Sequence, residues 1–512
     1  MGRPRLTSRR AAAVELAVVG AAFLAVLARL WVAQRALWLN GLDPLDPFAS
    51  PRYTADFAAG SADALLVATL GGVLTALWLW LVVRAGRWRG RALTAVAIGV
   101  PVVAAIALFV APPTLSIDAY SYLAHGHLAL TPGRNPYVDP AASVRDDPYG
   151  ALLAAAGWVP VHPQSPYGPL WTLIERTAVA LSGNDVALGV RLVKLPALLG
   201  LLAAAALTWD VVGRLRPEQR LRAVLLLLAS PLSLVELAGD GHNDGLMIGL
   251  VVLALWACVR RRPALAIVAL VLAVLVKATP LPLVLPVLTH LVRGREPGRR
   301  TLPVMAVAAV GSAALAVLLV APYWVGAATF QGLVASGTPS PSWSPSGVLF
   351  VLAGGLGPDG AAVPGSGAGT TTGLVLGAVL VAGAVAACVT SRTVTGLLRS
   401  CAVVALLAFV VLPVEWPWYA ALPAAILPLV PDGAAVAATA VLVLGSRLVA
   451  PYGDAATVGV VGFGTFGNEQ ALVGQSLPGL LALALTGART LALRAVALRR
   501  PAADAAAARP VR

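Results

Sequence analysis

Asp118 is the ionisable residue whose place in the sequence most directly indicates chemistry. It lies in the stretch 114–122, which follows the apolar run 92–111 and opens the longest polar segment of the first half of the chain. A carboxylate where a membrane helix meets water can take the proton of an attacking hydroxyl, and a phosphate leaving group needs no second acid. The alternative role is structural, because Ser116 and Asp118 are both of types that cap helix N-termini.

A second polar cluster occupies residues 239–244, between two apolar runs. Its two carboxylates, one imidazole and one amide are suited to binding sugar hydroxyls: Asp240, His242, Asn243 and Asp244. A divalent metal is conceivable but unsupported, because the spacing matches no specific ligand pattern, and no cofactor is assigned. The alternative is a polar turn that caps the following helix. Glu236, one turn earlier, lies within an apolar run, where a carboxylate needs a partner or a role.

Three cations depart from the general placement of basic residues in this chain. Arg191 and Lys194 are three residues apart and share one helix face, and Lys277 lies near the tip of a short apolar hairpin. A lipid phosphate at the membrane surface requires such partners, with arginine as a bidentate fork and lysine as a point charge. The alternative is that each long side chain extends to the interface without binding a ligand.

Aromatic residues accompany these polar groups. Trp416, Trp418 and Tyr419 are candidates for stacking on a sugar or on the first isoprene units of a lipid, although interfacial tryptophans also form belts with no ligand. Three tyrosines of the first long loop are assigned to the same sugar or acceptor contacts: Tyr120, Tyr122 and Tyr167.

The chain that must position these groups is strongly apolar. Of its 512 residues 59% are hydrophobic and 12% are charged, whereas soluble domains carry about 25% charged residues. Successive windows of roughly 18 or more apolar residues predict an all-α, polytopic membrane protein. The net charge of +14 does not indicate a nucleic-acid partner, because the basic residues fall in short loops between apolar runs. The expected partner is the lipid bilayer.

Clusters of arginine set the predicted topology. They occur near residues 84–91, 214–222, 260–262 and 293–300, and the positive-inside rule places them all in the cytoplasm. The alternation of apolar runs with these clusters predicts about 11–14 transmembrane helices, with both termini inside. It also predicts a multi-pass protein of the plasma membrane with Asp118 on the external, periplasmic side.

The same pattern divides the chain into three regions. We expect a cytoplasmic N-terminus at 1–11, a transmembrane domain at 12–487 and a basic, alanine-rich cytoplasmic tail at 488–512. Within the transmembrane domain, the external loop at about 112–185 is expected to be ordered and partly helical. A second external loop, at about 323–372, is rich in Gly, Ser, Pro and Thr, which is typical of a mobile lid or a partly disordered segment.

The order of several short motifs resembles a known family, the polyprenol-phosphomannose-dependent alpha-1,6-mannosyltransferases of actinobacteria (MptA/MptB type) of the GT-C superfamily. The motifs are Asp118-Ala-Tyr-Ser-Tyr, Asn135-Pro-Tyr, Pro166-Tyr-Gly-Pro-Leu-Trp171, Gly241-His-Asn-Asp-Gly-Leu-Met247, Lys277-Ala-Thr-Pro280 and Trp416-Pro-Trp-Tyr419. The resemblance runs from about 118 to 419. Glu415 departs from it, because a Gln-Pro-Trp-Tyr-like sequence is expected there.

The resemblance implies a GT-C fold and an inverting transfer of mannose from a polyprenyl-phosphate-mannose donor. The acceptor would be a mannan on a glycolipid, of the lipomannan or lipoarabinomannan type, extended by alpha-1,6 linkages at the outer face of the membrane. Asp118 matches the family's catalytic acidic residue at the start of the first long loop. Two alternatives stay open from the residues alone: a lipid or solute transporter or flippase, and a GT-C enzyme that uses another polyprenyl-phosphate sugar such as arabinose.

Overall fold

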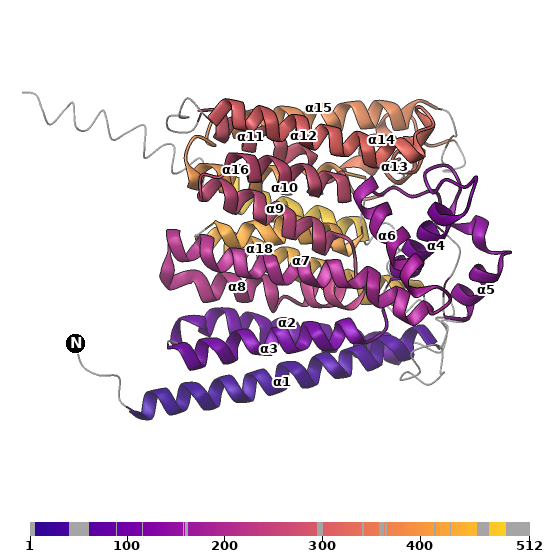
Figure 1. Ribbon diagram of the computed structural model, residues 1–512. Coiled ribbons are helices and arrows are strands. Elements are labelled where there is room, and N and C mark those ends of the chain that lie inside the picture. The colour runs from indigo at the N-terminus through magenta and orange to yellow at the C-terminus, as the bar shows by residue number, and fades with distance from the viewer. Residues whose placement is uncertain are drawn as a thin grey trace, which may run out of the picture.

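The fold consists of helices throughout the part of the chain that the structure describes. The computed structural model describes residues 6–39, 61–88, 90–114, 116–156, 158, 162–293, 301–339, 342–357, 363, 366–413, 416–430, 432–457 and 470–487. Figure 1 shows long helices lying side by side in one bundle, with shorter helices gathered at one end. The prediction of an all-α polytopic membrane protein is confirmed at this level. The predicted tail 488–512 and Glu415 lie outside the described residues.

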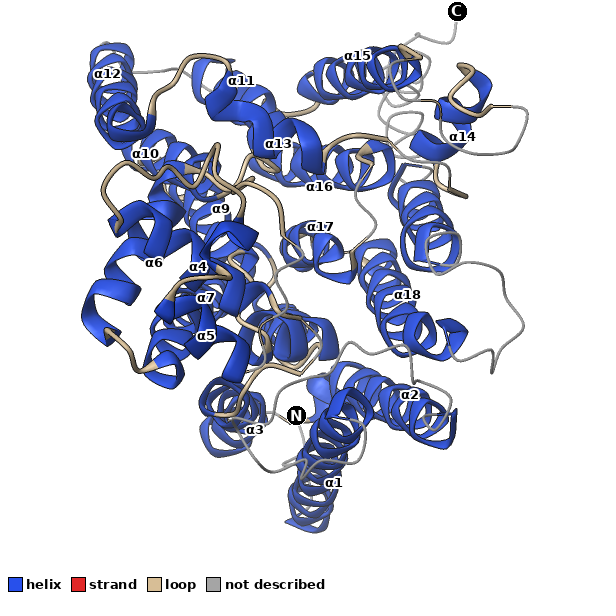
Figure 2. Ribbon diagram, turned by 90° about the vertical axis from the view of Figure 1, so that its right-hand side faces the viewer, coloured by secondary structure: helices blue, strands red, loops and turns tan. Residues whose placement is uncertain are grey.

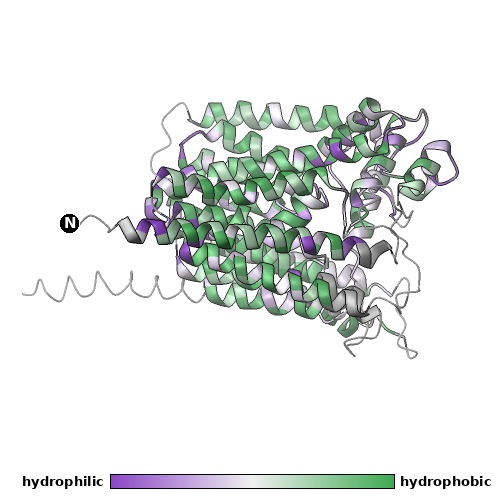
Figure 3. Cartoon of the chain, turned by 90° about the horizontal axis from the view of Figure 1, so that it is seen from below, coloured by the Kyte–Doolittle hydropathy of each residue, from purple (hydrophilic) through white to green (hydrophobic). Residues whose placement is uncertain are grey.

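The bundle contains helices from the beginning, the middle and the end of the chain. They are α1 (Leu6–Leu39), α2 (Ser61–Arg84), α3 (Arg91–Val110), α7 (Val186–Leu215), α8 (Arg220–Leu228), α9 (Asp244–Val259), α10 (Pro263–Val276), α11 (Val284–Arg293), α12 (Thr301–Val320), α15 (Ala368–Cys388), α16 (Val394–Val411) and α18 (Gly433–Thr457). A π-helical segment, η5 (Ser233–Gly239), follows α8. Apolar residues cover the length of these helices in Figure 3, whereas hydrophilic ones concentrate at the two ends of the bundle.

Seven of the described helices are long and apolar enough to cross a membrane, and the number becomes eight if the bent pair formed by α8 and η5 is one span. Six further apolar helices have 10–17 residues each. A span requires about 17–25 residues, so these shorter helices fall at or below the minimum length. The sequence-based count of 11–14 includes such short helices, which pack within the bundle in Figure 2.

Helices α4 (Asp118–Leu130), α5 (Pro148–Ala155) and α6 (Pro169–Ser182) cover one end of the bundle. The chain enters this cover from α3 and leaves it into α7. Because α2 ends at Arg84 and α7 ends just after Arg214, these arginines lie at the opposite end of the bundle. Between α12 and α15 the described residues include two more short helices, α13 (Gln331–Ser336) and α14 (Pro345–Leu352).

The sequence explains why the chain turns at the end of α3. Pro112 and Pro113 follow the helix, and proline both lacks an N–H group and disfavours a helical residue before it. Helix α1 holds this turn, because Trp31 Nε1 donates to Pro112 O at 3.3 Å and Arg35 donates to Pro113 O at 3.3 Å. A new helix, α4, then begins at Asp118.

Close packing between α7 and α9 fixes the turn 239–244 against the bundle. A side chain at Gly249 would place its Cβ 2.7 Å from Gly200 Cα, and a Cβ at Gly245 would meet the backbone of Ala197. Helices approach this closely only where small residues face each other, and in lipid such packing drives helix association. Gly241 adds a local requirement, because its φ of 76° is one that residues with a Cβ rarely adopt.

Gly249→Leu is expected to destabilise the protein by about 1–3 kcal/mol or more, because the backbone of Gly200 leaves no space for the side chain. The measurement is thermal unfolding of the purified chain in detergent. Gly373→Leu in α15 is the matched control, since nothing lies within 4 Å of a Cβ built at that glycine. Equal unfolding temperatures for the two variants would contradict the close packing of α7 against α9 at Gly249.

Candidate functional site

Asp118 is the first residue of α4 and lies where the covering helices meet the bundle. Asp118 is only 4% exposed to solvent. Its backbone N–H donates to Ser116 Oγ at 3.1 Å, and its Oδ2 accepts a hydrogen bond from the Tyr167 hydroxyl at 3.2 Å. At the start of a helix, the helix dipole also favours its negative charge. Ser116 therefore holds the backbone of Asp118, and Tyr167, from the other end of the same loop, holds its carboxylate.

Two imidazoles flank this carboxylate. His242 Nδ1 lies 3.2 Å from Asp118 Oδ2, and His162 Nε2 lies 3.6 Å from Asp118 Oδ1. His242 is fully buried and its ring stacks on Trp418 with centroids 3.9 Å apart. The sequence predicted that His242 binds sugar, and in the structure its imidazole lies against Asp118. His162 was not among the predicted residues, because a histidine in a long loop has no spacing that relates it to Asp118.

The other nitrogen of His242 faces a second carboxylate. His242 Nε2 lies 3.3 Å from Glu236 Oε2, and Glu236 Oε1 pairs with the guanidinium of Arg447 on α18. Glu236 thus has the partner that a carboxylate in an apolar run requires. Arg447 was missed from the sequence, since it lies 211 residues from Glu236 and no local pattern links them. The result is a chain of alternating charge: Asp118, His242, Glu236, Arg447.

Lys277 reaches the same region from the end of α10. Its Nζ lies 2.7 Å from Asp244 Oδ2 and 4.1 Å from the centroid of the Tyr419 ring. Lys277 is 6% exposed and Asp244 is 1% exposed. Of the three cations selected for phosphate binding, Lys277 is the one whose charge acts on Asp118, where it helps to lower the pKa of the carboxyl group.

Lys194 and Asp240 both hold the end of α3. Lys194 Nζ donates to Leu108 O at 3.0 Å and to Ala111 O at 2.6 Å, so its charge satisfies carbonyl groups at a helix C-terminus. Asp240 Oδ1 accepts the N–H of Thr114 at 2.7 Å, in the turn that follows α3. Both side chains are fully buried.

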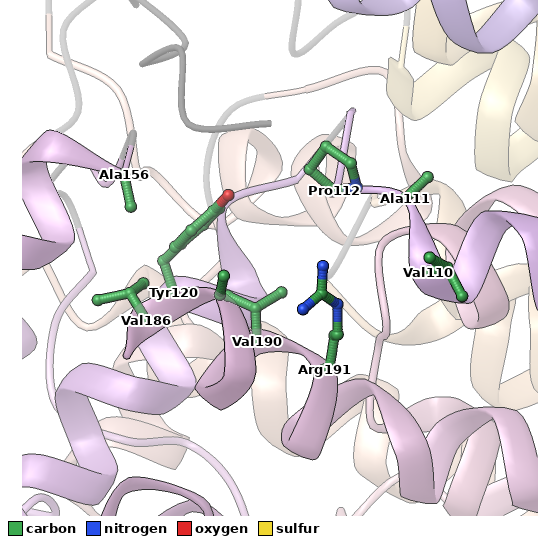
Figure 4. A pocket seen from close by; sticks show the side chains of 9 residues that line it. Val110, Ala111, Pro112, Tyr120, Ala156, Val186, Val190 and Arg191 are labelled. Atoms are coloured by element: carbon green, nitrogen blue, oxygen red, sulfur yellow. The ribbon is translucent and has the colours of Figure 1, made fainter. Parts of the chain in front are cut away.

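Arg191 lies elsewhere, at an exposed position on α7. Figure 4 shows its guanidinium and the Tyr120 side chain at one small pocket whose other walls are apolar. The pocket is lined by the end of α3, by Tyr120 of α4 and by the first turns of α7. The three predicted phosphate ligands thus occupy separate environments: Arg191 at this pocket, Lys194 at the end of α3, and Lys277 beside Asp244.

The remaining predicted residues surround the buried centre. Tyr122 packs edge-on against Tyr167, with centroids 5.2 Å apart, and its hydroxyl accepts the Asn243 N–H at 3.4 Å. The Asn243 side chain is buried and makes no hydrogen bond among the described residues. Trp416 stacks on Trp418, with centroids 5.2 Å apart, and is 47% exposed. Trp416 is thus exposed, whereas Trp418 and Tyr419 are partly buried.

The pKa values define the charges of the centre at neutral pH. Burial raises the pKa of the Asp118 carboxyl, but contact with His242 and the charge of Lys277 bring it below its usual range. Burial lowers the pKa of His242, which lies in the turn between η5 and α9, yet contacts with Asp118 and Glu236 raise it to about 10. Burial lowers the pKa of His162 more than the attraction of Asp118 raises it. Asp118 is thus ionised, His242 protonated and His162 neutral.

Glu236, Asp240 and His242 each place one ligand atom within 4.8 Å of the others, so a metal ion must be considered. The charges around them argue for an ion-pair network instead. Glu236 already pairs with a guanidinium, and both nitrogens of His242 lie within 3.3 Å of carboxylate oxygens. A divalent cation here would face Arg447 at close range, which the Coulomb energy in a buried site opposes.

Comparisons with known proteins classify the chain. The N-terminal domain model of the alpha-(1->6)-mannopyranosyltransferase family matches residues 25–293, more than half of the chain. The match includes Asp118, Glu236, His242 and Lys277. Trp418 and Arg447 lie beyond it.

Two curated relatives match a shorter region. Alpha-(1->6)-mannopyranosyltransferase A of Mycobacterium tuberculosis is 33% identical over 179 residues, which is 34% of this chain and 32% of that protein. The enzyme of the same name from Corynebacterium glutamicum is 32% identical over 176 residues, 34% of each chain. The matched region thus spans about a third of the length of these relatives.

Among solved structures, ArnT from Cupriavidus metallidurans bound to undecaprenyl phosphate aligns over 77% of both chains, with a TM-score of 0.37 and 15% identity. This likeness is too low to carry an argument. The family model runs from within α1 to the end of α11, more than half of the chain, and the chain therefore belongs to the alpha-(1->6)-mannopyranosyltransferase family.

Proposed function

We propose that this protein transfers mannose from polyprenyl-phosphate-mannose to a mannan-type glycolipid acceptor and forms alpha-1,6 linkages. The observation that carries the proposal is the meeting of an ionised, buried carboxylate, Asp118, with a buried ammonium group, Lys277, in one cluster. A sugar transfer from a phosphate donor needs these two groups, a base for the acceptor hydroxyl and a cation for the departing phosphate. Family membership supports the choice of mannose and of the linkage.

The chemical step follows from the charges. The acceptor hydroxyl attacks the anomeric carbon as the bond to the phosphate oxygen breaks, and its proton passes to Asp118. Because contact with His242 holds the pKa of Asp118 low, the carboxylate accepts the proton late, when the attacking oxygen has become strongly acidic. Attack opposite to the leaving phosphate inverts a beta-linked donor to an alpha product. The polyprenyl phosphate departs with its charge intact and needs no acid.

We assign a different role in phosphate binding to each of the three cations. Lys277 is in place for the leaving group, and its contact with the phosphate strengthens as the bond breaks, which favours the transition state. We assign Arg191, with Tyr120 beside it, to an outer contact with lipid phosphate at the mouth of the apolar pocket. Lys194 has a supporting role, because it anchors the end of α3. Both the apolar pocket and the turn that leads to Asp118 depend on the position of that helix end.

The sugar contacts are assigned by exposure. Trp416 is 47% exposed, and its indole ring suits stacking on a sugar ring. Trp418, which stacks on Trp416, also contacts His242, and Tyr419 contacts Lys277. The arginine-rich helix ends lie opposite the α4–α6 cover, and the positive-inside rule therefore supports our proposal that Asp118 lies at the external face of the plasma membrane.

Asp118→Asn is expected to fold and to lose transfer by about 100- to 10,000-fold, because the amide cannot accept the hydroxyl proton. The measurement is transfer of label from radiolabelled polyprenyl-phosphate-mannose into a longer glycan, in membranes that express the full chain. Asp146→Asn is the matched control, since Asp146 is an exposed carboxylate of the same loop. Near-normal turnover of Asp118→Asn would reject the base. Label that only changes leaflet in the wild type would instead favour a flippase.

Arg191→Ala is expected to raise KM for the donor by about 3- to 10-fold with little change in kcat, because the contact is exposed and is made equally in ground and transition states. Steady-state kinetics with purified protein and varied donor concentration measure both constants. The control is Arg176→Ala on α6, an exposed arginine of the same covering layer. A fall in kcat with constant KM would mean that Arg191 acts on the leaving group.

A further inference from the structure

We propose that Arg447 and Glu236 are positioning residues that hold Asp118 in place through His242. This inference rests on the proposed function and assigns a role in it to α18, from the half of the chain that the family model does not match. Neither residue lies at the reacting atoms. Their effect passes along the chain of ion pairs that begins at Arg447 and ends at Asp118.

The geometry leaves little freedom to the imidazole. His242 Nδ1 lies 3.2 Å from Asp118 and Nε2 lies 3.3 Å from Glu236, so the ring bridges two carboxylates on opposite sides. Trp418 stacks on its face with an interplanar angle of 20°. The stack resists tilting of the ring, and the two carboxylates resist sliding and rotation within the ring plane.

The order of charges explains why Arg447 matters at a distance. With Arg447 present, Glu236 is shared between the guanidinium and the imidazolium. Without it, Glu236 would be a buried carboxylate whose remaining counter-charge is His242. The imidazolium would then be drawn towards Glu236 and away from Asp118. The carboxylate of Asp118 would keep only the Tyr167 hydroxyl, and His162 at 3.6 Å, as neighbours that fix its direction.

Burial makes this coupling strong. Arg447 is 5% exposed, Glu236 is 1% exposed and His242 is fully buried. Solvent therefore screens these charges little, and a displacement of one is felt by the next. An ion pair whose only role is to join α18 to η5 would consist of Arg447 and Glu236 alone. It would not require an imidazole between Glu236 and Asp118.

The experiment separates positioning from stability by removing both charges together. Glu236→Gln/Arg447→Met leaves no unpaired buried charge, so the full chain is expected to fold with nearly the wild-type unfolding temperature. We expect kcat for transfer to fall roughly 10- to 100-fold, the range observed when outer partners of site residues are removed, with KM for the donor within about twofold of wild type. The single variant Arg447→Lys, which keeps the positive charge, is expected to retain most of the wild-type kcat.

The matched control is another ion pair of the same chemistry outside this centre. Arg84 Nε and Glu15 Oε1 lie 2.5 Å apart between α2 and α1. The double variant Glu15→Gln/Arg84→Met should leave kcat unchanged. Glu236→Asp provides a second test, because it keeps both charges but withdraws the carboxylate from His242 and from Arg447 by one methylene. We expect a lower kcat at constant KM for this variant as well.

Wild-type kcat in Glu236→Asp, or in a folded Glu236→Gln/Arg447→Met variant, would overturn the positioning role and leave a purely structural ion pair. If the double variant does not fold, Glu236→Asp decides the question. Failure of the wild-type chain to transfer mannose would overturn the proposed function, and this inference with it. The two kinds of failure are therefore distinguished by the wild-type assay.

Discussion

The centre of this protein depends on the rule that a charge taken out of water must meet an opposite charge. Asp118, His242, Glu236 and Arg447 are all nearly or fully buried, and each lies beside a neighbour of the other sign. The covering helix α4, the turn 239–244, η5 and α18 must meet at one place to satisfy them. A second buried pair, Lys277 with Asp244, ties α10 to the same centre. Removing one partner from such a pair leaves an uncompensated charge, which costs about 3–5 kcal/mol.

The apolar bundle makes this arrangement possible by supplying rigid walls. Small residues let α7 and α9 approach closely, and the turn 239–244 begins α9 directly. Lys194 and Asp240 then fix the end of α3 from which the Asp118 loop starts. The charges of Lys194 and Asp240 thus stabilise the end of α3, although the sequence predicted that both residues bind a ligand. The cluster therefore carries both the support of the loop and the groups suited to chemistry.

Much of the site was accessible from the sequence because membranes restrict where polar residues occur. Asp118, the cluster 239–244 and Lys277 stood out as ionisable groups at the borders of apolar runs, and the structure gathers them around one point. Arg191 stood out for the same reason but lies at a separate pocket on the outer side of α7. The helical membrane fold followed from hydropathy alone, whereas the division into full spans and shorter helices depends on where each helix ends.

The sequence by itself determined the class of fold, the residues that interrupt the apolar runs and the resemblance to one family, because hydropathy and motif order are local properties. Only the tertiary structure decided how those residues pair. It placed His242 between two carboxylates, directed the Lys194 side chain to carbonyl groups at a helix end, and brought Arg447 to Glu236 from 211 residues away. The physical reason is that buried charges are satisfied through space, by partners whose separation along the chain leaves no trace in the local pattern.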